Sequence, residues 1–258
     1  MFRRLFGRKA VEYIQPSTGG RLIYAIGDVH GRADLLRPLL REIARDALAT
    51  RPVERPMLIF LGDYVDRGPD SRGGVDIILE MLRDGAFEVV ALKGNHEEAL
   101  LLFLSEPGFA GTWMEHGGGP TLASYGVQPA AGRTDLDAWT LVRDAFAETL
   151  PPEHLAFYQG LEPLHVVGDY AFVHAGVRPG VPLEEQTEKD LLWIRYDFLQ
   201  ARGPFEKVIV HGHTPTEEPQ ILRHRLGVDT GAYATGVLTA VRLYGEEQSV
   251  IQAKVERN

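Results

Sequence analysis

Short apolar runs that stop at small polar clusters recur along this 258-residue chain. The first three lie at residues 21–26, 57–61 and 87–92, and each is apolar enough to predict a buried strand. Between the first two, apolar side chains recur at helical spacing from 33 to about 49. A strand, a helix and a second strand in this order predict two parallel strands joined by a right-handed crossover.

The pattern continues beyond the third run. Apolar positions at Ile77, Ile78, Met81 and Leu82 mark a helix after the second strand, and a further helix runs to Leu104 after the third. Later apolar runs at 170–173 and 207–210 predict two more strands. A β-rich tail with a strand at 237–243 closes the chain.

Residues 105 to about 160 have a different character, because glycine and proline become dense and no metal-type cluster occurs. Helical patterns at 136–149 and 152–160 lead us to interpret this stretch as an inserted helical cap that carries substrate selectivity. We therefore expect a basic N-terminal arm at 1–20 and one domain at 21–258, with the cap inside it.

Composition narrows the class of protein. Hydrophobic residues make up 44% and charged residues 24%, as in ordinary globular proteins. A net charge of −9 argues against nucleic-acid binding, since that needs a basic surface. The absence of cysteine excludes disulfides, zinc–thiolate sites and cysteine nucleophiles. With no membrane-length apolar run and no secretory signal after the basic start, we expect a cytoplasmic protein without stable membrane insertion.

Five of the predicted strands stop where metal-binding residue types begin. A lone histidine after a strand is more often structural than a ligand, but five of the nine histidines fall in these few residues. Open α/β sheets bind ligands at the carboxyl ends of their strands, so we expect the clusters to meet. The five clusters are Asp28 with His30, Asp63, Asn95 with His96, His174, and His211 with His213.

These residue types suit a pair of divalent cations. Two such ions about 3.5–4 Å apart can clamp a phosphoryl oxygen and ionise a water near neutral pH. Mixed imidazole and oxygen ligands disfavour calcium and magnesium and suit manganese, iron or zinc. The ligand types alone leave open which of these three metals is bound.

The ordered motifs Gly-Asp-Val-His-Gly, Gly-Asp-Tyr-Val-Asp-Arg-Gly, Gly-Asn-His-Glu, His-Ala-Gly and His-Gly-His-Thr resemble those of the calcineurin-like metallophosphoesterases. More narrowly, they are similar to the phosphoprotein phosphatase family of serine/threonine protein phosphatases in its bacterial and phage form. The resemblance extends from residue 21 to about 245. It implies an α/β fold in which helices flank a β-sandwich, with a dinuclear centre at the carboxyl edge of the sheet.

The resemblance also implies a role for each motif residue. Asp63 would bridge two divalent ions, for which we expect manganese, with iron and zinc as alternatives. His213 is preferred to His211 as a ligand because it stands nearer the threonine of its motif. The implied metal ligands are Asp28, His30, Asp63, Asn95, His174 and His213.

The remaining motif residues would act on the substrate. His96 would be the general acid, oriented by Asp66, while a hydroxide between the metals attacks phosphorus directly. Guanidinium groups bind two phosphate oxygens at once and stay charged, which suits a phosphate clamp. The phosphate-binding residues implied are Arg67, Arg195 and Asn95.

The resemblance implies an enzyme that removes phosphate from phosphoserine and phosphothreonine in proteins or peptides, and phosphotyrosine remains open. Residues 229–233 look like the bacterial branch but also like the diadenosine tetraphosphatases, so a dinucleotide hydrolase is the alternative. The family's dinucleotide branch typically lacks an acid at the position of Asp66, which favours the protein phosphatase. A non-catalytic binding module on the same fold is the remote third hypothesis.

Overall fold

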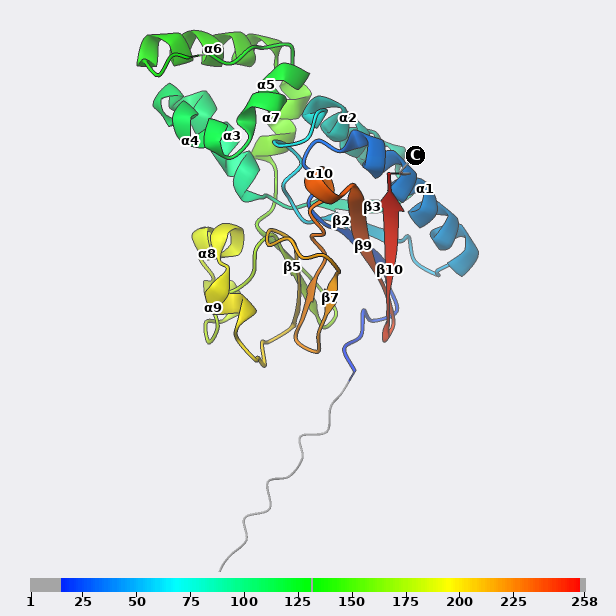
Figure 1. The fold of residues 1–258 in the computed structure, drawn as a ribbon. Coiled ribbons are helices and arrows are strands. Elements are labelled where there is room, and N and C mark those ends of the chain that lie inside the picture. The colour runs from blue at the N-terminus through cyan, green and yellow to red at the C-terminus, as the bar shows by residue number, and fades with distance from the viewer. Residues whose placement is uncertain (1–14, 131, 256–258) are drawn as a thin grey trace, which may run out of the picture.

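The computed structural model describes residues 15–130 and 132–255, so residues 1–14 of the predicted basic arm lie outside the described part. Two five-stranded sheets lie face to face, and helices cover their outer sides (Figure 1). This architecture confirms the predicted α/β sandwich flanked by helices. No helix among the described residues has both the length and the apolar character needed to cross a membrane.

The first sheet contains the three strands that open the chain. Strand β1 pairs in parallel with β2, and β2 pairs in parallel with β3, which confirms the parallel strands predicted from the opening strand–helix–strand pattern. The last two strands join the other side of β1 as an antiparallel hairpin. In spatial order the sheet consists of β10 (Glu247–Lys254), β9 (Val237–Tyr244), β1 (Leu22–Ile26), β2 (Met57–Phe60) and β3 (Glu88–Ala91).

The second sheet is built from the later part of the chain. Its central strands β5, β6 and β8 are parallel, and the two edge strands are antiparallel to their neighbours. The spatial order is β4 (Leu164–Val167), β5 (Tyr170–Val173), β6 (Val208–His211), β8 (Arg225–Gly227) and β7 (Gln220–Ile221). Strands β5 and β6 are the two predicted from their apolar runs.

The central strands are apolar on both faces because each face is covered. In β1, Ile23 and Ala25 contact the second sheet, whereas Leu22, Tyr24 and Ile26 pack under helices. This alternation follows from the two-residue period of a strand. The covering helices of the first sheet are α1 (Ala33–Thr50), α2 (Ser71–Asp84) and α3 (Asn95–Ser105).

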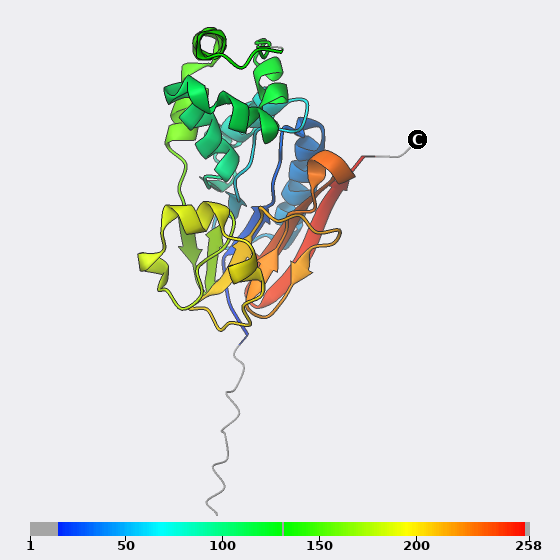
Figure 2. The same ribbon diagram turned by 60° about the vertical axis from the view of Figure 1, so that its left-hand side comes forward.

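Residues 105–160 form helices above the strand ends, as the sequence pattern predicts (Figure 2). Their core is aromatic, and Trp113 stacks at 4.7 Å from Phe103 and 6.0 Å from Phe146, between ring centroids. The elements are η1 (Pro107–Phe109), α4 (Ala110–Glu115), α5 (Gly118–Ser124), α6 (Leu136–Thr149) and α7 (Pro152–Gln159). Here they are called the cap helices.

Several short elements have no counterpart in the sequence pattern. Between β5 and β6 the chain forms η2 (Leu183–Glu185), α8 (Glu188–Trp193) and α9 (Tyr196–Leu199), which cover the outer face of the second sheet. A single helical turn, α10 (Ala232–Thr235), precedes β9. These pieces are too short to produce the repeated apolar spacing on which a helix prediction depends.

Candidate active site

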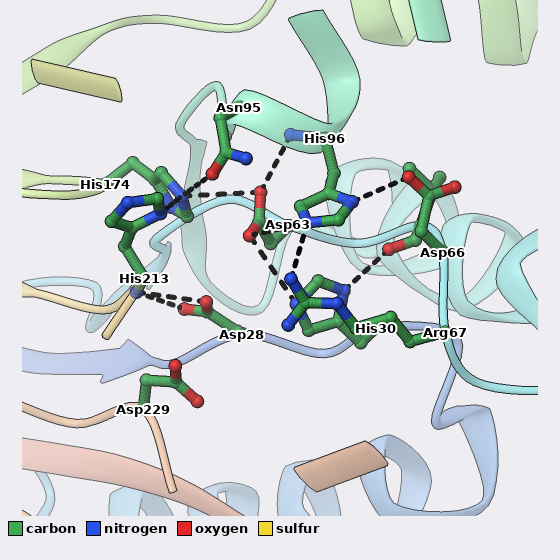
Figure 3. Close-up of polar contacts among 12 residues, drawn as sticks. Asp28, His30, Asp63, Asp66, Arg67, Asn95, His96, His174, His213 and Asp229 are labelled. Carbon is green, nitrogen blue, oxygen red and sulfur yellow. Dashed lines mark hydrogen bonds and ion pairs between the residues drawn. The ribbon is translucent and has the colours of Figure 1, made fainter. Parts of the chain in front are cut away.

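The five polar clusters come together at one edge of the two sheets (Figure 3). They follow β1, β2, β3, β5 and β6, whose carboxyl ends meet there because the strands within each sheet's centre are parallel. At most 4% of any of these side chains is exposed: Asp28, His30, Asp63, Asn95, His96, His174, His211 and His213. So many buried polar groups of mixed charge need partners or a bound ion.

Asp63 lies at the centre of this site. Its Oδ2 is 3.5 Å from His30 Nε2, and its Oδ1 is 3.3 Å from His174 Nε2. Two groups of potential metal ligands therefore share Asp63, one containing His30 and His96 and the other containing His174 and His213. A carboxylate with one oxygen toward each group is arranged as a bridging ligand must be.

Asp28 and Asn95 complete the two sides of the cluster. The backbone N–H of His213 donates to both Asp28 oxygens, at 3.0 and 3.1 Å, which fixes that carboxylate beside the last motif. Asn95 Oδ1 lies 2.9 Å from His174 Nε2. All six predicted metal ligands are thus gathered in one place, contributed by both sheets.

The imidazoles direct a ring nitrogen atom toward the centre of the cluster. His30 and His174 each donate their Nδ1–H to a backbone carbonyl, of Val65 and Leu61 respectively, at 2.8 Å. This bond orients each ring with its Nε2 toward the cluster, as in metal-binding histidines. His213 Nε2 is buried without a hydrogen-bond partner among the described residues. The donor set therefore fits divalent cations.

The pKa values of two of the imidazoles agree with metal binding, which needs a neutral ring. Burial lowers the pKa of His30 to about 3 and that of His213 to about 2, so both rings are neutral at physiological pH. For His174, burial acts in the same direction, but the Asp63 carboxylate outweighs it and raises the pKa to about 9. Burial and the neighbouring Asp229 raise the pKa of Asp28 well above its usual range.

Backbone strain is concentrated in this site. Within the described ranges, six non-glycine residues have positive φ, and five of them are site residues, with φ between 45° and 71°. Such conformations are costly for residues with a Cβ and persist where the surrounding structure enforces them. The five are His30, Asp63, Asp66, Arg67 and His213.

Two glycines allow the backbone to approach the carboxylates. A Cβ at Gly94 would overlap Asp63 Oδ1, and a Cβ at Gly212 would overlap Asp28 Oδ1. The glycines of the Gly-Asn-His-Glu and His-Gly-His-Thr motifs are therefore required by close packing against proposed metal ligands.

Glu97 is a central buried residue that sequence reasoning missed. Its Oε2 accepts the backbone N–H groups of Asp63 and Gly94, at 2.9 and 3.0 Å. Its Oε1 accepts those of Tyr64 and Val65, at 2.8 and 3.3 Å. The carboxylate ties the loop after β2 to the start of α3. Its place in the first turn of a predicted helix was the available signal, since acidic residues favour that position.

The Nδ1 atom of His96 faces a carboxylate, whereas those of His30 and His174 face backbone carbonyls. His96 Nδ1 lies 2.6 Å from Asp66 Oδ2, and both side chains are almost completely buried. Burial alone would lower the pKa of His96, but Asp63 and Asp66 outweigh it and raise the pKa. The proposed acid and its proposed partner are therefore brought into direct contact.

Asp66 is itself held by the cap helices. Trp113 Nε1–H donates to its Oδ2 at 3.0 Å, and Thr121 Oγ1–H donates to its Oδ1 at 2.6 Å. Neither Trp113 nor Thr121 was selected from the sequence. They lie 47 and 55 residues from Asp66, and no local pattern connects positions so far apart.

Arg67 lies next to His96, with its Nη2 at 3.0 Å from His96 Nε2. Its guanidinium carbon stands 4.8 Å from the ring centroid of Tyr233, which also meets the His30 ring edge to face at 5.4 Å. The backbone N–H of Arg67 donates to Gly117 O at 3.0 Å, so Arg67, like Asp66, contacts the cap helices. Tyr233 is a further site residue that the motifs did not single out.

Arg195 and His211 occupy different surroundings. Arg195 is half-buried and its Nη1 donates to His213 O and Thr214 Oγ1, at 3.1 and 3.0 Å. The guanidinium thus lies on the His213 side of the cluster, opposite Arg67. His211 donates its Nδ1–H to Gly212 O, packs against Phe198, and belongs to neither ligand group.

A family model described as calcineurin-like phosphoesterase matches residues 21–237. The chain therefore belongs to the calcineurin-like phosphoesterase family, whose members use divalent metals. The enzyme class is a metal-dependent phosphoesterase hydrolase.

A relative from Bacillus thuringiensis, named bis(5'-nucleosyl)-tetraphosphatase PrpE [asymmetrical], is 28% identical over 246 residues. The match covers 87% of this chain and 91% of that protein. Among solved structures, one described as a putative diadenosine tetraphosphatase is similar with a TM-score of 0.62 and 18% identity, over 91% of this chain and 94% of the other.

A Saccharomyces cerevisiae serine/threonine phosphatase, described as similar to human phosphatase PP5, has a TM-score of 0.59 and 14% identity. The similarity covers 93% of this chain and 81% of that one. At these identities the two solved structures support the fold alone.

Proposed function

We propose that this protein hydrolyses dinucleoside polyphosphates and cleaves a bis(5'-nucleosyl) tetraphosphate asymmetrically. The observation that carries the proposal is the near full-length match to the tetraphosphatase of Bacillus thuringiensis. It favours the alternative of the sequence analysis over the phosphoprotein substrate that was expected from Asp66.

The proposed metal ligands are Asp28, His30, Asp63, Asn95, His174 and His213, and manganese is the proposed metal. Bound divalent cations would polarise a phosphoryl oxygen and lower the pKa of a water molecule. Arg67 and Arg195 flank the cluster from opposite sides, so both guanidinium groups can bind non-bridging phosphate oxygens.

Asymmetrical cleavage takes one water for each substrate molecule. The water oxygen forms a bond to phosphorus, and the bond from that phosphorus to the bridging oxygen of the phosphate chain breaks. The bridging oxygen leaves with the electron pair as part of the triphosphate, and the displaced proton goes to solvent. The products are one nucleoside monophosphate and one nucleoside triphosphate.

In our proposal, His96 supplies a proton when the leaving oxygen needs one. Its Nε2 accepts from Arg67 while its Nδ1–H faces Asp66. A phosphate that draws the Arg67 guanidinium toward itself would free Nε2 to carry a proton. Asp66 would then stabilise the doubly protonated ring.

A phosphoserine and phosphothreonine phosphatase is the second candidate, and the His96–Asp66 pair supports it. A polyphosphate is a weakly basic leaving group, whereas a serine alkoxide is strongly basic and gains far more from a general acid. The buried His96–Asp66 pair, which Trp113 and Thr121 hold in place, is suited to supplying the proton that a serine alkoxide requires.

The test compares substrates directly. Manganese-loaded protein is incubated with bis(5'-adenosyl) tetraphosphate and, in parallel, with phosphoserine and phosphothreonine peptides, and products are separated by chromatography. We expect AMP and ATP in equal amounts, with a higher kcat/KM than for any peptide. Dephosphorylated peptide without nucleotide cleavage would overturn the proposal in favour of the second candidate.

A further inference from the structure

A groove of about 330 Å³ lies beside the His213 end of the site, between α8 and α9. That volume falls within the range of small-molecule pockets. The groove is contributed by the short helical segment between β5 and β6, which the five motifs do not include. Its lining includes Lys189, Trp193, Arg195 and Tyr196.

Trp193 presents an indole next to the proposed metal centre. The side chain is 38% exposed, and its ring centroid lies 6.4 Å from that of His213. Its Nε1–H donates to Glu98 Oε2 at 2.7 Å, and Glu98 belongs to α3, the helix that also carries His96. The indole is therefore anchored in one orientation and its exposed surface borders the groove.

The charges around the groove suit an anionic ligand. Arg178 is neutralised by a bidentate pair with Asp190, at 2.6 and 2.9 Å. Lys189, in contrast, has no ion-pair partner within the described ranges, and Arg195 engages only its Nη1 there. Both cationic groups line the groove, and Arg195 also contacts His213 of the cluster.

We propose that this groove binds the nucleoside of a nucleotide whose phosphate occupies the metal centre, with the base stacked on Trp193. The inference deepens the proposed function and rests on it. Arg195 contacts both His213 and the groove, so it links the phosphate position to the nucleoside position. Tyr196, 74% exposed on the same groove, supplies a second aromatic surface.

Aromatic stacking uses the π-face that every base has, so the groove should accept purines and pyrimidines alike. The two carboxylates nearest the groove, Asp190 and Asp197, both face Arg178. Asp190 is held through both of its oxygens, whereas Asp197 makes a single 3.4 Å contact and its side chain is 72% exposed.

The test measures equilibrium binding of AMP and of ribose 5-phosphate, which differ by the base alone, to the manganese-loaded protein. Calorimetry should show AMP binding about tenfold more tightly, the order expected for stacking one base on an aromatic side chain. The Trp193→Ala variant should lose that preference, and Trp193→Phe should retain most of it. The control Leu141→Ala removes an exposed apolar side chain from α6 and should keep the wild-type preference.

Equal affinities for the two ligands in the wild-type protein would overturn the inference. So would a preference for AMP that survives in Trp193→Ala. Failure of the proposed function has a different signature, since the wild-type protein would then leave bis(5'-adenosyl) tetraphosphate intact. A thermal melting curve of each variant checks that the protein is folded.

Discussion

His96 differs from the neighbouring histidines in the group that receives its Nδ1–H. His30 and His174 donate to backbone carbonyls; the His30 ring is neutral, whereas the Asp63 carboxylate raises the pKa of His174. His96 donates to the Asp66 carboxylate, which favours a protonated ring. We propose that His30 and His174 bind metal and that His96 transfers a proton.

Replacing His96 with Asn should separate these roles. We expect hydrolysis of a phosphoserine peptide to fall by about two to four orders of magnitude, the usual contribution of a general acid. Hydrolysis of bis(5'-adenosyl) tetraphosphate should fall less, because its leaving group is a weaker base. The measurement is kcat/KM for both substrates, together with the manganese content of the variant.

His96 also lies close enough to Asp63 to be counted among potential ligands, with 3.9 Å between Nε2 and Oδ2. Manganese content therefore decides between acid and ligand. A His96→Asn protein with the wild-type metal content supports the acid. Loss of manganese, with equal losses on both substrates, would contradict it.

Among the secondary-structure elements, the cap helices contact the candidate active site directly. Trp113 of α4 and Thr121 of α5 donate to Asp66, and Gly117 between these helices accepts from the Arg67 backbone. The sequence predicted the cap as a determinant of selectivity. We propose that it also positions the general acid, through Asp66.

The Trp113→Phe substitution tests this positioning role. Phenylalanine retains an aromatic ring beside Phe103 and Phe146 but removes the donor to Asp66 and part of the buried ring system. A hydrogen bond to a buried charged group is worth about 1.5–3 kcal/mol, and the smaller ring also loses packing, so the free energy of unfolding should fall by at least that amount. We expect kcat on the phosphopeptide to fall about tenfold with KM unchanged, less than for loss of the acid itself.

Trp139→Phe is the matched control. Trp139 packs edge to face against Phe103 in the same aromatic core and is also buried, but no hydrogen bond of its indole N–H is found among the described residues. Its replacement should affect stability through packing and leave kcat near the wild-type value. Equal effects of both substitutions on kcat would show that the indole donor has no positioning role.

The elements with long patterns could be predicted from the sequence, and those that depend on distant contacts could not. The strands before Asp28, Asp63 and Asn95 are short and mostly apolar runs, so their carboxyl ends and the clusters behind them were predictable. The helices α8 and α9 are six and four residues long, too short for a helical period to repeat. The groove beside Trp193 was missed for that reason.

The site itself shows the same limit. Residue types and their positions after the strands identified the five clusters, because metal chemistry selects aspartate, histidine and asparagine, and the family resemblance selected the proposed ligands among them. Glu97, Trp113 and Thr121 act through hydrogen bonds to parts of the chain far away in sequence, and an ordinary core or cap role is compatible with each of them in isolation. Their contribution became visible only when the folded chain placed them against Asp63 and Asp66.

At the scale of the whole molecule, the two sheets are needed together to build the site. The first sheet supplies Asp28, His30 and Asp63, and the second supplies His174 and His213. The apolar interior between the sheets fixes the distance between these groups, because it is closely packed and resists deformation. Asp63 lies where the contributions of the two sheets meet.

The most direct test of this account is the number of manganese ions bound per chain, measured by equilibrium dialysis alongside the rate of phosphoester hydrolysis. We predict two ions for the wild-type protein, with hydrolysis abolished by chelation and restored by manganese. Asp63→Asn removes the charge shared by both ligand groups and should lose at least one ion together with activity. One ion or none in the wild-type protein, or turnover that chelation leaves unchanged, would contradict the dinuclear centre proposed here.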